Sequence, residues 1–214
     1  MTASSIDDLM RRAPVIPVLT IERAEDAVPL AQALAEGGLP VLEITLRTEA
    51  ALAALEAIAK AGLPVIPGVG TVTSGQDLAR AADAGAQFAV SPGLTEPLAD
   101  AARHAAIPLL PGVATASELM RAMEQGFDRL KFFPAEASGG VAALKGFAAP
   151  FPTAKFCPTG GVSPSNAPTY LNTANVICVG GTWVAPAEDV RAGRWARITG
   201  LARTAAQFPR PGDG

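Results

Sequence analysis

The sequence contains very little histidine and cysteine. His104 is its one histidine, and Cys157 and Cys178 are its two cysteines, among 214 residues. A histidine-rich zinc site is therefore excluded, and Ser–His chemistry would have to use His104 alone. The two cysteines form no CxxC pair and do not indicate a disulfide framework. Any catalysis must therefore rely on other side chains.

Aromatic residues, runs of like charge and long hydrophobic runs are also scarce. Aromatic residues make up 5% of the chain, and the formal net charge is −3, with acids and bases scattered. Without a basic stripe, no nucleic-acid partner is expected. No apolar run reaches the roughly 18 residues of a membrane span, and residues 1–12 lack the apolar stretch of a secretion signal. We therefore expect a cytoplasmic protein with no membrane partner.

The chain instead shows a regular alternation of short β-branched runs and Ala/Leu-rich amphipathic stretches. The runs start at intervals of roughly 20–27 residues, the length of one strand–helix unit. Eight units predict an α/β fold, a single (β/α)8 TIM barrel over residues 1–214, with an open doubly wound sheet as the competitor. The expected strands are residues 15–19, 41–46, 65–71, 88–93, 108–115, 129–135, 156–162 and 175–183.

Helix ends and chain ends can also be predicted. The spacings from Thr73 to Gln76 and from Thr115 to Glu118 fit capping boxes at the starts of two helices. An extra helix over about residues 4–13 is expected to cover the barrel bottom. The tail, about residues 208–214, is expected to be disordered.

Two of the expected strands direct ionisable side chains toward the barrel axis. Strand side chains alternate between faces, so in VLEITLR the polar set Glu43, Thr45 and Arg47 opposes an apolar set that suits the helix layer. In RLKFFP the same alternation turns Lys131 and Phe133 inward. Barrel interiors are normally packed with apolar side chains, so these charges must pair or perform chemistry.

Lys131 permits two interpretations. It could form a purely structural buried ion pair with Glu43, although Arg47 would already satisfy a single carboxylate. Alternatively, it could be a nucleophile, since burial favours the neutral form of an amine, and a neutral amine attacks a ketone to form a Schiff base. Glu43 would then be the proton shuttle. Of the four lysines in the chain, Lys131 alone is flanked on both sides by predicted core, which favours the nucleophile.

Paired glycines end the last two expected strands, in PTGGV and VGGTW. Such glycines expose backbone N–H groups and allow a ligand to approach closely. In parallel barrels these two loops often hold a phosphate. We therefore expect a phosphate or other anion here, aided by the hydroxyl groups of Thr159 and Thr182.

Several motifs resemble one family from about residue 6 to about residue 205. These motifs are VLEITLRT, GVGTV, AQFAVSPGLTEPL, IPLLPGVATASE, KFFPAEASGG, FCPTGGVSP and VGGTWV. They are similar to those of the bacterial 2-dehydro-3-deoxy-6-phosphogluconate aldolases, also called 4-hydroxy-2-oxoglutarate aldolases. The resemblance implies a (β/α)8 barrel assembled as a homotrimer, with imine-forming class I chemistry that needs no metal and no cofactor.

The resemblance also implies roles for individual residues. Lys131 is the expected Schiff-base lysine, Glu43 the general acid/base and Arg47 the holder of the substrate carboxylate. The other expected substrate contacts are Thr71, Pro92 and Phe133, and the expected phosphate contacts are Thr159, Gly160, Gly161, Gly180, Gly181 and Thr182. The family commonly has serine where this chain has Thr182, whose extra methyl group could redirect the phosphate end.

The expected activity is cleavage of 2-dehydro-3-deoxy-6-phosphogluconate to pyruvate and glyceraldehyde 3-phosphate, in Entner–Doudoroff-type breakdown. The galactonate-derived epimer and 4-hydroxy-2-oxoglutarate are alternative substrates. From other classes, a non-catalytic sugar-phosphate-binding barrel or a metal-dependent lyase would compete. The sequence leaves open whether Glu136 is a second site carboxylate or a loop residue.

Overall fold

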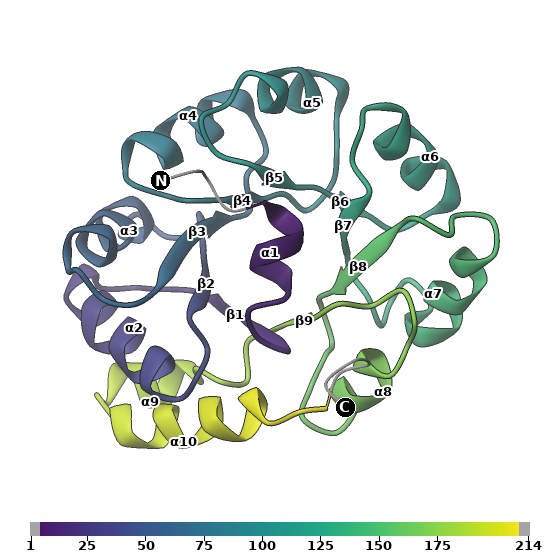
Figure 1. The fold of residues 1–214 in the computed structure, drawn as a ribbon. Helices are drawn as coiled ribbons and strands as arrows, with labels where there is room; N and C mark the ends of the chain where they lie inside the picture. The colour runs from purple at the N-terminus through teal and green to yellow at the C-terminus, as the bar shows by residue number, and fades with distance from the viewer. Residues whose placement is uncertain (1–4, 210–214) are drawn as a thin grey trace.

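The structure is a computed structural model that describes residues 5–209. Its strands lie around a common centre, and all its helices except the first lie outside them (Figure 1). The strands are β1 (Val15–Leu19), β2 (Val41–Thr45), β3 (Ile66–Gly70), β4 (Ala89–Val90), β5 (Leu109–Leu110), β6 (Gly112–Val113), β7 (Arg129–Phe132), β8 (Lys155–Pro158) and β9 (Val179–Gly181). The helices are α1 (Ile6–Met10), the 3-10 helix η1 (Ala24–Asp26), α2 (Ala27–Glu36), α3 (Ala51–Lys60), α4 (Gly75–Asp83), α5 (Glu96–Arg103), α6 (Ala116–Glu124), α7 (Gly140–Ala148), α8 (Ala167–Leu171), α9 (Ala187–Arg191) and α10 (Trp195–Ala206).

The prediction of one closed eight-stranded TIM barrel is wrong, because hydrogen bonding divides the strands into two parallel sheets. One sheet has six strands in the order β5-β4-β3-β2-β1-β9, and the other has three in the order β6-β7-β8. The expected strand 108–115 breaks at Pro111, between β5 and β6, because proline has no N–H to give to the ladder. At the other boundary, isolated bridges join Phe156 to Val176 and Thr159 to Gly180 in place of a continuous ladder.

The alternation of side chains along the strands is confirmed. Leu42, Ile44, Leu130 and Phe132 belong to the large apolar cluster between the strands and the outer helices. A second, smaller cluster combines residues of α1 with strand residues. Its buried members are Leu9, Met10, Ile16, Val41, Phe88, Val90, Leu110, Cys157, Ile177 and Cys178.

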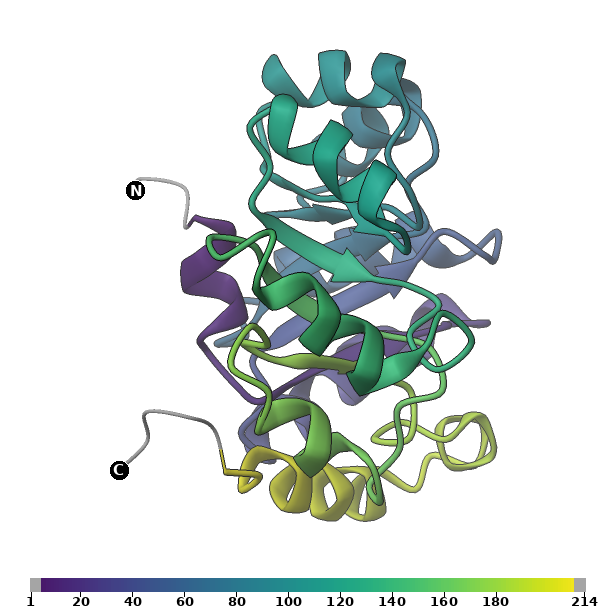
Figure 2. The same cartoon turned by 90° about the vertical axis from the view of Figure 1, so that its right-hand side faces the viewer.

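Helix α1 covers the end of the molecule from which the strands start, and the strand arrows point away from it (Figure 2). The predicted N-terminal helix is thus present, but it is shorter than residues 4–13, of which residue 4 lies outside the described residues. Ser5 and Asp8 form a capping box at its start. Of the expected disordered tail, residues 210–214 lie outside the described part of the chain.

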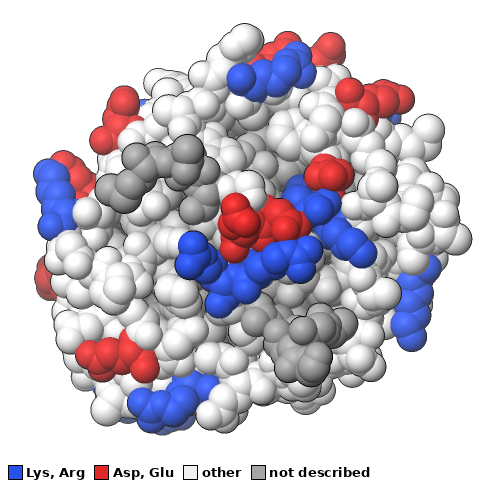
Figure 3. All heavy atoms as spheres, in the orientation of Figure 1, with Lys and Arg blue, Asp and Glu red and all other residues white. Residues whose placement is uncertain are grey.

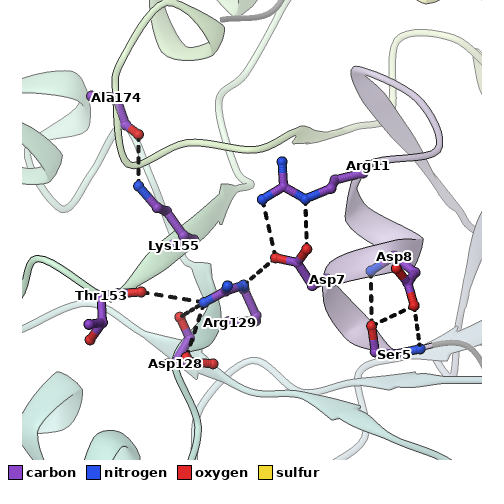
Figure 4. A network of polar contacts seen from close by, with 9 residues as sticks. All are labelled: Ser5, Asp7, Asp8, Arg11, Asp128, Arg129, Thr153, Lys155 and Ala174. Atoms are coloured by element: carbon purple, nitrogen blue, oxygen red, sulfur yellow. Dashed lines mark hydrogen bonds and ion pairs between the residues drawn. The ribbon is translucent and has the colours of Figure 1, made fainter. Parts of the chain in front are cut away.

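Charged side chains gather at the centre of this face (Figure 3). Asp7 of α1 forms ion pairs with Arg11 and with Arg129, the first residue of β7. Arg129 also pairs with Asp128 at 3.1 Å. Figure 4 shows how this network ties α1 to the start of β7, the strand that carries Lys131.

The capping predictions were partly correct. Thr115 and Glu118 form the expected capping box at the start of α6. Helix α4 is capped by Ser74, which accepts a hydrogen bond from the Asp77 N–H, one residue later than expected. Thr73 instead donates to the Asp77 carboxylate. Among residues 5–209, no helix is both long enough and apolar enough to cross a membrane.

Candidate active site

Lys131 and Glu43 meet in the space between the two sheets. Glu43 lies on β2 of the six-stranded sheet, and Lys131 lies on β7, the central strand of the smaller sheet. The Lys131 Nζ donates to Glu43 Oε1 at 3.0 Å. The two side chains are 6% and 4% exposed. The amine and the carboxylate predicted from strand alternation are therefore in direct contact and largely shielded from water.

Gly70 provides the space that the Glu43 carboxylate occupies, and the sequence reasoning missed it. A Cβ atom built on Gly70, the last residue of β3, would collide with Glu43 Oε1 and would lie 2.7 Å from its Cγ. Gly70 does not need its conformational freedom here, so close approach is the reason for glycine. In the sequence, the feature that could have indicated this close approach is that Gly70 is the second glycine within the expected strand 65–71.

Phe133 lies beside the amine, as predicted. The Lys131 Nζ is 5.2 Å from the centroid of the Phe133 ring, a cation–π geometry. Phe133 is half-buried and immediately follows β7. It therefore forms one wall beside the position that a ketone would occupy at Nζ.

Arg47 and Thr71 lie together, but not in the way expected from the sequence. Arg47 is exposed, and its Nε donates to Thr71 Oγ1 at 3.1 Å. Glu43 accepts its hydrogen bond from Lys131 and not, as expected, from Arg47. Thr71 has φ = 62°, a strained value for a β-branched residue. The Arg47–Thr71 pair thus lies beyond the ends of β2 and β3 and is joined by one hydrogen bond.

Pro92 lies in an exposed loop beyond β4. Its carbonyl lies so close to Gly112 that a Cβ atom there would collide with it. Gly112 is the register partner of Lys131 on the neighbouring strand. The backbone of Pro92 therefore packs against Gly112, which in turn pairs with Lys131 in the sheet.

The two glycine pairs lie side by side, joined by the bridge between Thr159 and Gly180. Gly160 and Gly161 have φ values of +99° and +79°, in the region that glycine favours. Gly180 and Gly181 are needed for space, because a Cβ atom on them would collide with Thr159 and Trp183. Thr159 is buried, whereas Thr182 is exposed. The predicted phosphate contacts thus form one local group. Glycine is required at the first pair by the positive φ and at the second pair by the lack of space for a side chain.

The arrangement of Lys131 and Glu43 fits both interpretations of the lysine. A nucleophilic amine beside one carboxylate provides the two groups that imine formation and proton transfer need. The same contact would also satisfy a purely structural ion pair.

Comparison with known proteins identifies the family of this chain. The family model "KDPG and KHG aldolase" matches residues 6–201. A KHG/KDPG aldolase of Escherichia coli (strain K12) is 52% identical over 204 residues, which cover 95% of this chain and 96% of the relative.

Solved structures agree with this match. A KDPG aldolase from Legionella pneumophila, with pyruvate captured as a covalent carbinolamine intermediate, has a TM-score of 0.94 and 44% identity and covers 95% of this chain and 99% of its own. A 2-keto-3-deoxy-6-phosphogluconate aldolase of Zymomonas mobilis, with 3-phosphoglycerate, has a TM-score of 0.92 and 48% identity, covering 98% and 99%. This chain therefore belongs to the KDPG and KHG aldolase family and is a carbon–carbon lyase.

Proposed function

We propose that this chain cleaves 2-dehydro-3-deoxy-6-phosphogluconate to pyruvate and glyceraldehyde 3-phosphate through a Schiff base on Lys131. The observation that carries the proposal is the 3.0 Å contact between the Lys131 amine and Glu43 in the space between the sheets. Covalent capture of pyruvate in the Legionella relative supports the same class of chemistry.

The proposed cycle starts with attack of the Lys131 amine on the C2 ketone, which gives a carbinolamine. Loss of water then forms the imine, an electron sink for the adjacent carbon. Glu43 accepts the proton of the C4 hydroxyl group while the C3–C4 bond breaks and its electron pair moves toward the imine, forming an enamine. Glyceraldehyde 3-phosphate departs, the enamine takes up a proton at C3, and hydrolysis releases pyruvate and the free amine.

The remaining predicted residues would bind the two ends of the substrate. Arg47, with Thr71, would hold the substrate carboxylate, because guanidinium groups bind carboxylates through two parallel hydrogen bonds. Phe133 and Pro92 would enclose the pyruvyl part. The distal phosphate would lie on the backbone N–H groups around Gly160, Gly161, Gly180 and Gly181, with the hydroxyl groups of Thr159 and Thr182.

A second substrate, 4-hydroxy-2-oxoglutarate, is favoured by the family description, which covers both KDPG and KHG aldolases. The galactonate-derived epimer of the first substrate differs from it at one hydroxyl group. A coupled assay of pyruvate release across the three compounds ranks them by kcat/KM. We assign the phosphorylated gluconate compound first, and a higher kcat/KM for either alternative would contradict that order.

The assembly and the physiological role are also proposals. We propose a homotrimer that acts in the cytoplasm, in sugar-acid breakdown of the Entner–Doudoroff type. These proposals rest on the family resemblance of the sequence. Sedimentation equilibrium measures the oligomeric state directly, and a monomer at working concentration would contradict the trimer.

Borohydride trapping tests the central proposal. Treatment with pyruvate and borohydride should reduce the imine and attach the ligand's mass to the peptide that contains Lys131. Lys131→Met should abolish the adduct, whereas Lys145→Met is the matched control, because Lys145 is exposed on α7. An adduct on another lysine, or none on the intact enzyme, would falsify the mechanism.

A further inference from the structure

Glu136 connects the loop that follows the lysine strand to the loop that carries the first glycine pair. Its backbone N–H donates to the Gly160 carbonyl at 3.1 Å. Its side-chain Oε1 accepts a hydrogen bond from the hydroxyl group of Tyr170, a residue of α8 that is 1% exposed. One residue thus holds the glycine loop through its backbone and reaches a third segment through its side chain.

The shape of the glycine loop depends on the Glu136 side chain. A Cβ atom on Gly161 would lie 2.5 Å from Glu136 Cγ and 2.7 Å from its Cβ. On the other side, a Cβ atom on Gly140, the first residue of α7, would lie 3.4 Å from Glu136 Oε1. The side chain therefore packs against Gly161 and against the start of α7.

Helix α8 holds the same loop from its other side. Asn166, which precedes α8, donates from Nδ2 to the Gly161 carbonyl at 3.1 Å and accepts from the Ser163 N–H at 2.7 Å. Tyr170 is one turn further along, and its N–H donates to the Asn166 carbonyl at 3.3 Å. The helix thus contacts the loop directly through Asn166 and indirectly through Tyr170 and Glu136.

A carboxylate so close to an anion-binding loop needs a reason, because like charges repel and Glu136 would weaken phosphate binding by charge alone. The hydrogen bond from Tyr170 provides that reason, since it fixes one carboxylate oxygen toward α8. The phenol of Tyr170 is a donor at neutral pH, and burial, together with this hydrogen bond and the charge of Glu136, raises its pKa further.

We propose that Glu136 and Tyr170 are positioning residues that hold residues 159–162 in the shape that binds the distal phosphate, and thereby set the preference for phosphorylated substrates. This inference rests on the proposed function. It predicts that loss of the Tyr170–Glu136 hydrogen bond weakens phosphate binding and leaves the pyruvyl end of the site unchanged.

The test compares Tyr170→Phe, Glu136→Ala and Glu136→Gln with the wild type and with Thr169→Ala, an exposed control on the same helix. For each protein, three quantities are measured: KM and kcat for 2-dehydro-3-deoxy-6-phosphogluconate, the inhibition constant of inorganic phosphate, and the pyruvate concentration for half-maximal borohydride trapping. Loss of this partly buried hydrogen bond to a charged group should raise KM and the phosphate inhibition constant by up to about tenfold in Tyr170→Phe and Glu136→Ala. The kcat and the trapping concentration should stay within about twofold of wild type. Glu136→Gln, which keeps an acceptor oxygen, should restore most of the affinity.

The possible outcomes are distinct. If Tyr170→Phe and Glu136→Ala change neither KM nor phosphate inhibition, or shift pyruvate trapping equally, the positioning role is overturned. If wild type does not trap pyruvate, the proposed function fails, and this inference fails with it. Thermal unfolding identifies a variant that does not fold, and the decision then rests on the other substitutions at the pair. Equal losses in Glu136→Gln and Glu136→Ala would also overturn the role assigned to the hydrogen bond.

Discussion

The Lys131 amine lies 3.0 Å from Glu43 Oε1, and this contact joins the smaller sheet to the larger one across the centre of the fold. The amine and its partner carboxylate therefore belong to residues that lie 88 positions apart in sequence. Each strand is held in its own sheet, so the geometry of the pair depends on how the two sheets meet.

The first prediction separates the roles of the two residues in catalysis. Glu43→Gln should lower kcat by about 10²–10⁴-fold, the usual contribution of a general acid/base. Pyruvate trapping on Lys131 should still occur in this variant, because the amine remains. Lys131→Met should lose both activity and trapping. Steady-state kinetics and mass spectrometry measure the two effects, and full activity of Glu43→Gln would remove Glu43 from the mechanism.

The second prediction concerns stability. Lys131→Met leaves the Glu43 carboxylate buried without its partner, and breaking such a pair costs about 3–5 kcal/mol. The double variant Lys131→Met/Glu43→Leu removes both charges, so it should recover much of that loss. Urea unfolding of the single and double variants measures the difference. A double variant less stable than Lys131→Met would show that the cost does not come from the unpaired charge.

The third prediction uses the close approach at Gly70. Gly70→Ala places a methyl group where the Glu43 carboxylate lies, so the carboxylate must move away from Lys131. We expect kcat to fall by at least about tenfold, since small misplacements of catalytic groups are costly. Gly200→Ala, on α10 with open space around its added Cβ, is the matched control and should stabilise the helix by up to about 1 kcal/mol. Wild-type kcat in Gly70→Ala would contradict the assigned role of the glycine.

The fourth prediction is a pH dependence of stability. The guanidinium groups of Arg11 and Arg129 hold the pKa of Asp7 below its usual range. Because the folded-state pKa is lowered, the stabilisation is complete above the unfolded-state pKa of about 3.9 and is lost as the pH falls through the folded-state value. Asp7→Asn should therefore cost about 1 kcal/mol or less at pH 7, and less still near pH 3.

Urea unfolding of wild type, Asp7→Asn and Asp83→Asn at both pH values measures this difference. Asp83, on α4, is an exposed aspartate and controls for loss of a carboxylate as such. A cost of Asp7→Asn that stays constant between pH 7 and pH 3 would count against the ion pairs as its source.

The sequence predicted the contact between Glu43 and Lys131 better than the architecture, for physical reasons. Alternation along a strand is a local property, so the inward direction of Glu43 and Lys131 followed from a few neighbouring residues. Continuity of a sheet depends on hydrogen bonds between segments far apart in sequence. Pro111 was visible in the sequence, but whether the sheet would break there, between β5 and β6, depended on the positions of the neighbouring strands.

Contacts between distant segments account for the other differences. The sequence led us to expect that the Arg47 side chain would satisfy Glu43, whereas in the structure its Nε donates to Thr71. Glu136 was left open because Tyr170, its hydrogen-bond donor, lies 34 residues away. The capping box at Thr115 was predicted correctly. At the start of α4 the N-cap is Ser74, whose neighbour Thr73 was an equally plausible N-cap residue from the sequence alone.

The ion pair between Asp7 and Arg129 means that shortening the chain at its N-terminus would affect β7. Arg129 and Lys131 lie on the same short strand, so β7 is fastened to α1 at one end and presents its amine near the other. Trimming away α1 would remove that fastening and would also uncover the apolar surface that Leu9 and Met10 now cover. Expression tags and deletions at this terminus are thus expected to shift the strand that carries Lys131, and the position of its amine with it.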